Sequence, residues 1–144
     1  MRIKARGYHG KVQQDRPGNR LLVMTPLLLR WIAALYWIAL TVLLLAPDPW
    51  GLFGIRHPPA GGWFFGPHFG CFVLLGGLVC CARFPGRPTA WAGALVGYAV
   101  AVEFAQALVP TRTVQWQDVT ANLAGLACGA LIGWAALRVR TDSH

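Results

Sequence analysis

Residues 103–133 read EFAQALVPTRTVQWQDVTANLAGLACGALIG, and this stretch decides how the rest of the chain is interpreted. It places two carboxylates, several carboxamides and an arginine between long apolar runs. A charge in the middle of a membrane helix costs about 2.5–3.5 kcal/mol even on the lenient insertion scale. Such groups must be held by partners inside the protein, and we expect the partners to be one another.

The composition indicates a membrane protein. Of the 144 residues, 56% are hydrophobic and 12% are charged, and the mean hydropathy is +0.47. Soluble proteins average about 25% charged residues. The apolar runs are about 20 residues long, which is the length needed to cross the hydrocarbon core of a bilayer. We therefore predict a single all-α domain embedded in the lipid bilayer.

The apolar runs predict a bundle of four membrane-spanning helices. Residues 1–24 form a basic arm, expected to be disordered in the cytoplasm. The helical domain follows at residues 25–137, and residues 138–144 form a short cytoplasmic tail. The expected spans are Pro26–Ala46, Phe64–Ala82, Ala90–Val109 and Val119–Leu137.

Local signals define the expected helix starts. Thr25 is suited to cap the first span, with Pro26 at its first position. Thr89 and Asp118 are suited in the same way to cap the third and fourth spans. A cleaved signal peptide is the rival interpretation of the first span, but its apolar region should have only about 7–15 residues. We therefore expect an uncleaved anchor.

The basic residues predict the orientation in the membrane. With four spans, Arg56 and Arg112 fall on one side, and all other lysines and arginines fall on the side of the two termini. Basic residues mark the cytoplasmic side, so both termini are expected there, in a multi-pass protein of the bacterial inner (cell) membrane. The residues on that side are Arg2, Lys4, Arg6, Lys11, Arg16, Arg20, Arg30, Arg83, Arg87, Arg138 and Arg140.

Several function classes are disfavoured. The net charge of +8 follows from this topological pattern, and no nucleic-acid motif with interleaved exposed aromatic residues accompanies it. The cysteines lie in apolar runs, without a CxxC pair or a Cys/His spacing suited to zinc. We expect no nucleic-acid partner, no cofactor and no metal. The cysteines are Cys71, Cys80, Cys81 and Cys128.

Six polar residues are expected to meet near the outer side of the bundle. Glu103 and Gln106 share a face near the end of the third span, and Asp118 and Asn122 share a face near the start of the fourth. A histidine opens the second span, and an arginine in the outer connection can reach the same level. The expected polar cluster consists of His68, Glu103, Gln106, Arg112, Asp118 and Asn122.

A stripe of glycines continues the face on which Asn122 lies. Gly125, Gly129 and Gly133 follow it at spacings of three, four and four residues. Small residues repeated in this way allow another helix to pack closely. The stripe is therefore expected to be a helix-packing surface, which turns the polar cluster toward the bundle rather than toward lipid.

The members of the cluster also have purely structural interpretations. Asp118 can be a helix cap, Arg112 an interfacial basic residue, and His68 a helix-start residue near water. Gln106 and Asn122 can be interhelical hydrogen-bond donors and acceptors, worth about 0.6 kcal/mol each. The carboxylate of the third span is the hardest to explain in this way, because a carboxylate inside a membrane indicates a functional site by default.

The polar positions and the glycines form one ordered pattern. It reads Glu103-x-x-Gln106, Pro110-x-Arg112 and Asp118-x-x-x-Asn122-x-x-Gly125-x-x-x-Gly129, preceded by His68, Phe72 and Leu75. This pattern resembles the VanZ-like family, named after the teicoplanin-resistance protein VanZ. Relatives often carry lysine three residues before the histidine, where this chain has Phe65. The resemblance covers residues 103–133 closely and 64–76 loosely.

The resemblance implies a small bacterial membrane protein with several spans, and it brings no settled biochemical activity. In the name-giving member it implies resistance to a glycopeptide antibiotic that acts on the cell envelope. We favour a non-enzymatic protein that uses the polar cluster to bind an amphiphile at the outer leaflet. The expected ligand is a lipid-linked cell-envelope component or a glycopeptide such as teicoplanin.

Three other functions stay open. A membrane enzyme acting on a lipid-linked substrate would use Glu103 or His68 as its general base, with Arg112 as an anion clamp. A proton-coupled transporter would use the same two residues as a relay, and without an inverted repeat it would need a homo-oligomer to build its pathway. A metal site would draw on His57, His68, Glu103 and Asp118.

Overall fold

The computed structural model describes residues 17–49, 51, 54, 65–110 and 114–142. These residues form four helices and no strand, as the sequence predicts for an all-α protein. The helices are α1 (Pro17–Leu45), α2 (Phe65–Ala82), α3 (Pro88–Gln106) and α4 (Trp116–Asp142).

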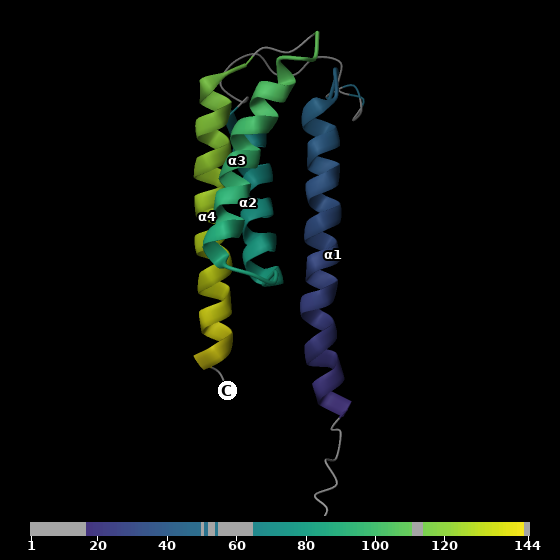
Figure 1. The fold of residues 1–144 in the computed structure, drawn as a ribbon, viewed down its shortest axis with the longest axis vertical. Coiled ribbons are helices and arrows are strands. Elements are labelled where there is room, and N and C mark those ends of the chain that lie inside the picture. Colours follow the sequence, from purple (N-terminus) through teal and green to yellow (C-terminus); the bar gives the residue numbers. More distant parts are fainter. Residues whose placement is uncertain (1–16, 50, 52–53, 55–64, 111–113, 143–144) are drawn as a thin grey trace, which may run out of the picture.

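The helices run up and down, and α2, α3 and α4 lie together with α1 along one side (Figure 1). The start of α1, the α2–α3 turn and the end of α4 point toward one end of the molecule, and the α3–α4 connection lies at the other. Buried apolar side chains from all four helices form one core. They are Leu40 and Leu44 of α1, Phe72, Leu75 and Val79 of α2, Leu95, Ala99 and Val102 of α3, and Leu126 of α4.

The closest helix pair is α2 and α4, and glycines make this approach possible. A Cβ atom added to Gly125 would lie 2.5 Å from the carbonyl oxygen of Phe69, and one added to Gly76 would lie 2.6 Å from that of Leu126. Added Cβ atoms on Gly129 and Gly133 would also overlap atoms of α2. The glycine stripe of α4 therefore lies against the backbone of α2, with no room for side chains between them.

Polar contacts connect α1 to the other helices. Arg30 donates from Nε to the carbonyl oxygen of Ala82 (3.2 Å) and from Nη2 to that of Arg83 (2.7 Å). These carbonyls lie at the end of α2, where they have no partner within the helix. Tyr36 donates its hydroxyl hydrogen to the carbonyl oxygen of Cys71 (2.9 Å). The first predicted span is thus tied by hydrogen bonds to the second helix.

A hydroxyl pair connects α1 to α3. Thr41 donates to the carbonyl oxygen of Trp37 (2.8 Å), so its Oγ1 is left to accept the hydroxyl hydrogen of Tyr98 (2.9 Å). The ring of Tyr98 also packs edge-on against Trp37, with centroids 5.1 Å apart. Together with the Arg30 and Tyr36 contacts, this pair makes α1 an integral part of the bundle.

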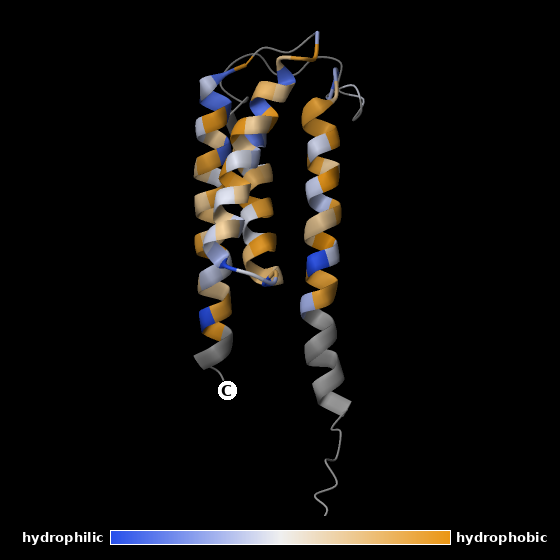
Figure 2. Ribbon diagram, viewed as in Figure 1, coloured by the Kyte–Doolittle hydropathy of each residue, from blue (hydrophilic) through white to orange (hydrophobic). Residues whose placement is uncertain are grey.

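Among the described residues, two helical segments are long and apolar enough to cross a membrane: Pro26–Leu45 of α1 and Trp116–Val139 of α4. A third apolar segment, Gly66–Ala82, is shorter. Both long segments expose large apolar side chains, such as Trp31 (64% exposed) and Leu131 (65%). A soluble protein would bury most such surface, whereas a bilayer covers it. Hydrophobic residues accordingly recur along the described part of α1 in Figure 2.

Some predicted helix boundaries are wrong. Helix α1 begins at Pro17, so residues 17–24 are helical rather than disordered, and Pro26 lies inside the helix. Helix α3 begins at Pro88 with Arg87 as its N-cap, so Thr89 is not the cap. It ends at Gln106, and successive i→i−3 bonds carry the chain to Val109. The early end has a physical cause, because the residue before Pro110 avoids the α conformation.

Replacing Gly129 with alanine tests the α2–α4 contact. The new methyl group meets the backbone of Val73, so the helices must separate, and we expect a loss of about 1–3 kcal/mol of unfolding free energy. The matched control is Gly97→Ala in α3, where a Cβ atom meets nothing within 4 Å. Unfolding in mixed micelles measures both variants. Equal stability of the two variants would contradict the packing described here.

Candidate functional site: a buried polar cluster at one end of the bundle

Three helix ends bring buried polar side chains together. His68 lies in the first turn of α2, Glu103 and Gln106 lie in the last turn of α3, and Asp118 and Asn122 lie in the first two turns of α4. Glu103 and Asn122 have no exposed surface, and Gln106 and Asp118 are 2% and 8% exposed. Hydrophilic residues gather at this end of α3 and α4 in Figure 2. Polar groups removed from water to this extent need partners within the protein.

Glu103 holds the start of α4. Its Oε1 accepts a hydrogen bond from the backbone N–H of Gln115 (3.0 Å). The carbonyl oxygen of Gln115 in turn accepts from the N–H groups of Asp118 (3.0 Å) and Val119 (3.3 Å). Gln115 is therefore the N-terminal cap residue, and the expectation that Asp118 caps this helix is wrong. Asp118 instead lies inside the first turn, where a carboxylate suits the positive end of the helix dipole.

Gln106 connects the cluster end of α3 to the end of α1. Its Nε2 donates to the carbonyl oxygen of Leu44 (3.1 Å), one of the last carbonyls of α1. The last carbonyls of a helix have no N–H partner within that helix, so a donor from elsewhere must satisfy them. Gln106 thus forms an interhelical hydrogen bond, which is the purely structural role considered for it from the sequence.

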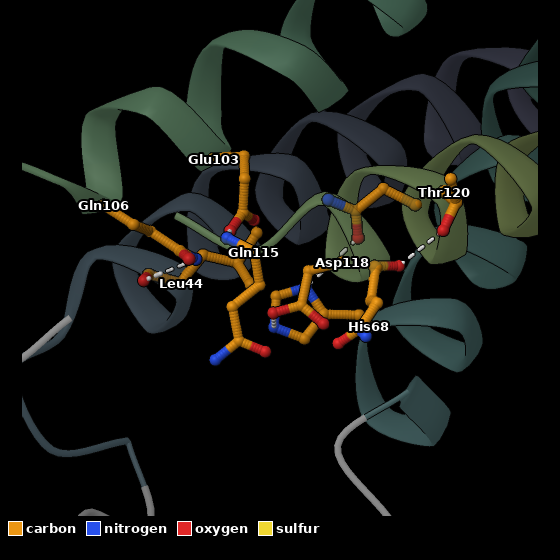
Figure 3. Close-up of polar contacts among 9 residues, drawn as sticks. Leu44, His68, Glu103, Gln106, Gln115, Asp118 and Thr120 are labelled. Atoms are coloured by element: carbon orange, nitrogen blue, oxygen red, sulfur yellow. Dashed lines mark hydrogen bonds and ion pairs between the residues drawn. The ribbon is translucent and has the colours of Figure 1, made fainter. Parts of the chain in front are cut away.

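His68 lies between two side chains of α4 (Figure 3). Its Nδ1 is 3.1 Å from Oδ1 of Asn122. An amide oxygen only accepts, so His68 donates the hydrogen of Nδ1, which leaves Nε2 facing Asp118. The distance from Nε2 to Oδ2 of Asp118 is 3.8 Å, which is too long for a hydrogen bond. The side chains of His68 and Asp118 are 13% and 12% exposed, so the cluster reaches the surface there.

Two buried atoms of the cluster have no hydrogen-bond partner. They are Oε2 of Glu103 and Nδ2 of Asn122. Within the described residues, no lysine or arginine forms an ion pair with Glu103 or Asp118. Leaving a buried polar atom unpaired costs about 1–3 kcal/mol, and more when the group is charged. The hydrogen-bonding capacity of these two atoms is therefore not satisfied within the cluster.

The structure brings four of the six predicted residues into one group: His68, Glu103, Asp118 and Asn122. One ligand atom from each of the first three lies within 4.8 Å of the others. Gln106 lies on the same helix turn as Glu103 but bonds to α1. Arg112 and His57 lie outside the described residues, so their expected parts stay predictions.

Sequence reasoning missed the backbone partners of this cluster. The N–H of Gln115 and the carbonyl of Leu44 are main-chain groups, which no side-chain pattern identifies. The hydroxyl of Thr120, beside the cluster in Figure 3, donates to the carbonyl oxygen of Gln117 (2.7 Å) within α4. One signal was available, because the free N–H groups at an uncapped helix start need an outside acceptor.

The fold and the cluster define an all-helical protein with two potential membrane spans and an internal polar site. A family model described as VanZ/LLP1 matches residues 52–138, which is more than half of the chain. The chain belongs to the VanZ/LLP1 family, and the resemblance noted from the sequence is confirmed. The matched segment contains α2 and α3 entirely and α4 as far as residue 138, and hence the whole cluster. No curated protein and no solved structure matches the chain.

Replacing Gln106 with leucine tests the link between α3 and α1. The carbonyl of Leu44 loses its donor in a buried setting, so the unfolding free energy should fall by about 1–3 kcal/mol. Gln117→Leu is the control, because the Gln117 side chain is exposed and its loss should change stability by less than about 0.5 kcal/mol. Unfolding in micelles compares the two variants. If Gln106→Leu matches the control, the bond does not contribute to stability.

Proposed function

We propose that the polar cluster binds the head of an amphiphile or of a lipid-linked cell-envelope component. The main support for this proposal is that two buried atoms, Oε2 of Glu103 and Nδ2 of Asn122, have no hydrogen-bond partner. One is an acceptor and the other a donor, so a bound head that offers both a donor and an acceptor would satisfy the two atoms together. His68 and Asp118 supply the partly exposed rim through which it would enter.

The surroundings of the cluster support an amphiphilic ligand rather than a fully polar one. Phe104, Leu108 and Trp116 are 51%, 85% and 68% exposed at the same end of α3 and α4. The rings of Phe104 and Trp116 meet edge to face, with centroids 6.0 Å apart. Exposed aromatic residues at helix ends are typical of a membrane interface. A ligand here would place its polar head in the cluster and its apolar part along these side chains.

The proposed setting is a four-span protein with both termini in the cytoplasm. Arg30, the α2–α3 turn with Arg83 and Arg87, and the end of α4 with Arg138 lie at the end opposite the cluster. Basic residues mark the cytoplasmic side of a membrane. The cluster would then open toward the outer leaflet, where envelope components are exposed. A link to teicoplanin resistance comes from the family resemblance and stays a prediction.

Reporter fusions test the proposed topology. Green fluorescent protein fused after His144 should fluoresce, because the proposed C-terminus is cytoplasmic. Alkaline phosphatase, which is active only outside the cytoplasm, should be active when fused at Pro110 and inactive when fused at Gly86 in the α2–α3 turn. The reverse pattern at Pro110 and Gly86 would contradict the proposed orientation.

Ligand binding can be measured directly on the purified chain. Calorimetry in detergent micelles with teicoplanin, and native mass spectrometry with a bacterial envelope-lipid extract, should each show saturable binding. Glu103→Gln keeps an oxygen for Gln115 but removes the charge, so we expect binding at least about tenfold weaker, or about 1.4 kcal/mol. Gln117→Glu, outside the cluster, is the control. The proposal would be contradicted if neither teicoplanin nor the lipid extract binds saturably, or if Glu103→Gln binds as tightly as the unaltered chain.

A further inference from the structure

We infer that His68, Glu103 and Asp118 form a binding site for one divalent transition-metal cation of the zinc type. Each residue offers a ligand atom, and the three atoms lie within 4.8 Å of one another. The three residues lie in three different helices, so no short spacing in the sequence indicates the site. This inference goes beyond the proposed function, since a cation needs no amphiphile in order to bind.

The free oxygen of Glu103 is the first argument for a cation. The residue is completely buried, Oε1 is occupied by the N–H of Gln115, and Oε2 has no hydrogen-bond partner. A buried carboxylate needs a positive partner or further donors to balance the loss of hydration. No lysine or arginine in the described part of the chain contacts this carboxylate. A metal ion among the three ligand atoms would supply the missing charge.

The orientation of His68 is the second argument. Its Nδ1 hydrogen is donated to the side-chain oxygen of Asn122, which fixes the ring and leaves the lone pair of Nε2 toward Asp118. Histidines that bind metals hold their second nitrogen in this manner. A tetrahedral metal with bonds of about 2.0–2.2 Å places its ligand atoms roughly 3.3–3.6 Å apart. The 3.8 Å between Nε2 and Oδ2 of Asp118 needs only a small closure.

A simple ion pair does not explain the arrangement as well. If His68 is protonated, it can pair with Asp118 across the 3.8 Å gap. That pairing leaves Oε2 of Glu103 without a partner, although the Glu103 carboxylate belongs to the same group of ligand atoms. The positive ends of α2 and α4 also favour the carboxylates rather than a cation. This dipole effect is confined to the first helical turn and is weak beside metal–ligand bonds.

The donor set indicates the class of metal. Imidazole nitrogen suits zinc and neighbouring transition metals, whereas magnesium and calcium prefer sites made only of oxygen ligands. Three protein ligands leave a fourth position open, as in zinc sites that take up water or a substrate. The partly exposed His68 and Asp118 side chains place that position toward the surface. A cation there would also let a site with two carboxylates accept an anionic head group.

Zinc binding by the full chain, without any added amphiphile, tests the inference. Protein in detergent micelles is stripped with EDTA, and zinc is titrated against a competing indicator and counted by elemental analysis. We expect about one zinc per chain and an upward shift of the melting temperature. Glu103→Gln, Asp118→Asn and His68→Gln should each weaken binding at least about tenfold. Magnesium at the same concentration should give no shift.

Control variants separate this site from other potential ligands. Asp48→Asn removes a carboxylate that bonds to the N–H of Gly51, and Cys128→Ser removes an exposed thiol. Neither change should alter the zinc stoichiometry, and a cobalt-loaded sample should lack a thiolate charge-transfer band. Zinc binding that survives all three cluster variants, or an unaltered chain that neither holds zinc nor melts at a higher temperature with it, would overturn the inference. Teicoplanin binding measured in EDTA shows separately whether the proposed function stands.

Discussion

A carboxylate without access to water is the constraint on which the rest of this structure depends. Glu103 is fully buried, and its two carboxylate oxygens differ in their hydrogen bonding. One oxygen holds the N–H of Gln115 and so fixes where α4 begins, and the other has no partner. Because α4 begins there, Asp118 and Asn122 arrive beside His68. Glu103 therefore has a structural role through Oε1 and a candidate binding role through Oε2.

Close helix packing makes that burial possible. The glycine faces of α2 and α4 meet backbone to backbone, which brings the first turn of α2 against the first turns of α4. Larger residues on either face would push His68 away from Asn122. On the opposite side, α1 is joined through Arg30, Tyr36 and Thr41, and its outer face keeps large apolar side chains exposed. The bundle is thus tight within and apolar outside, as a lipid environment requires.

Much of this arrangement could be predicted from the sequence, because periodicity is local. The helical class, the glycine stripe and the shared faces of Glu103 with Gln106 and of Asp118 with Asn122 all follow from spacings of three or four residues. The start of α1 could not, since a basic, proline-containing segment carries no apolar period. The cap at Gln115 was missed because its stabilising partner lies in another helix. The convergence of three ligand atoms depends on interhelical distances, which no single-helix pattern contains.

A double-mutant cycle between His68 and Asn122 tests the central claim most directly, because it measures whether side chains from α2 and α4 meet in the cluster. The unfolding free energies of His68→Ala, Asn122→Ala and the double variant are compared in the same micelles. The account predicts a coupling energy of about 0.5–1.5 kcal/mol, as expected for a partly buried interhelical hydrogen bond. Additivity of the two single effects, within about 0.3 kcal/mol, would contradict it.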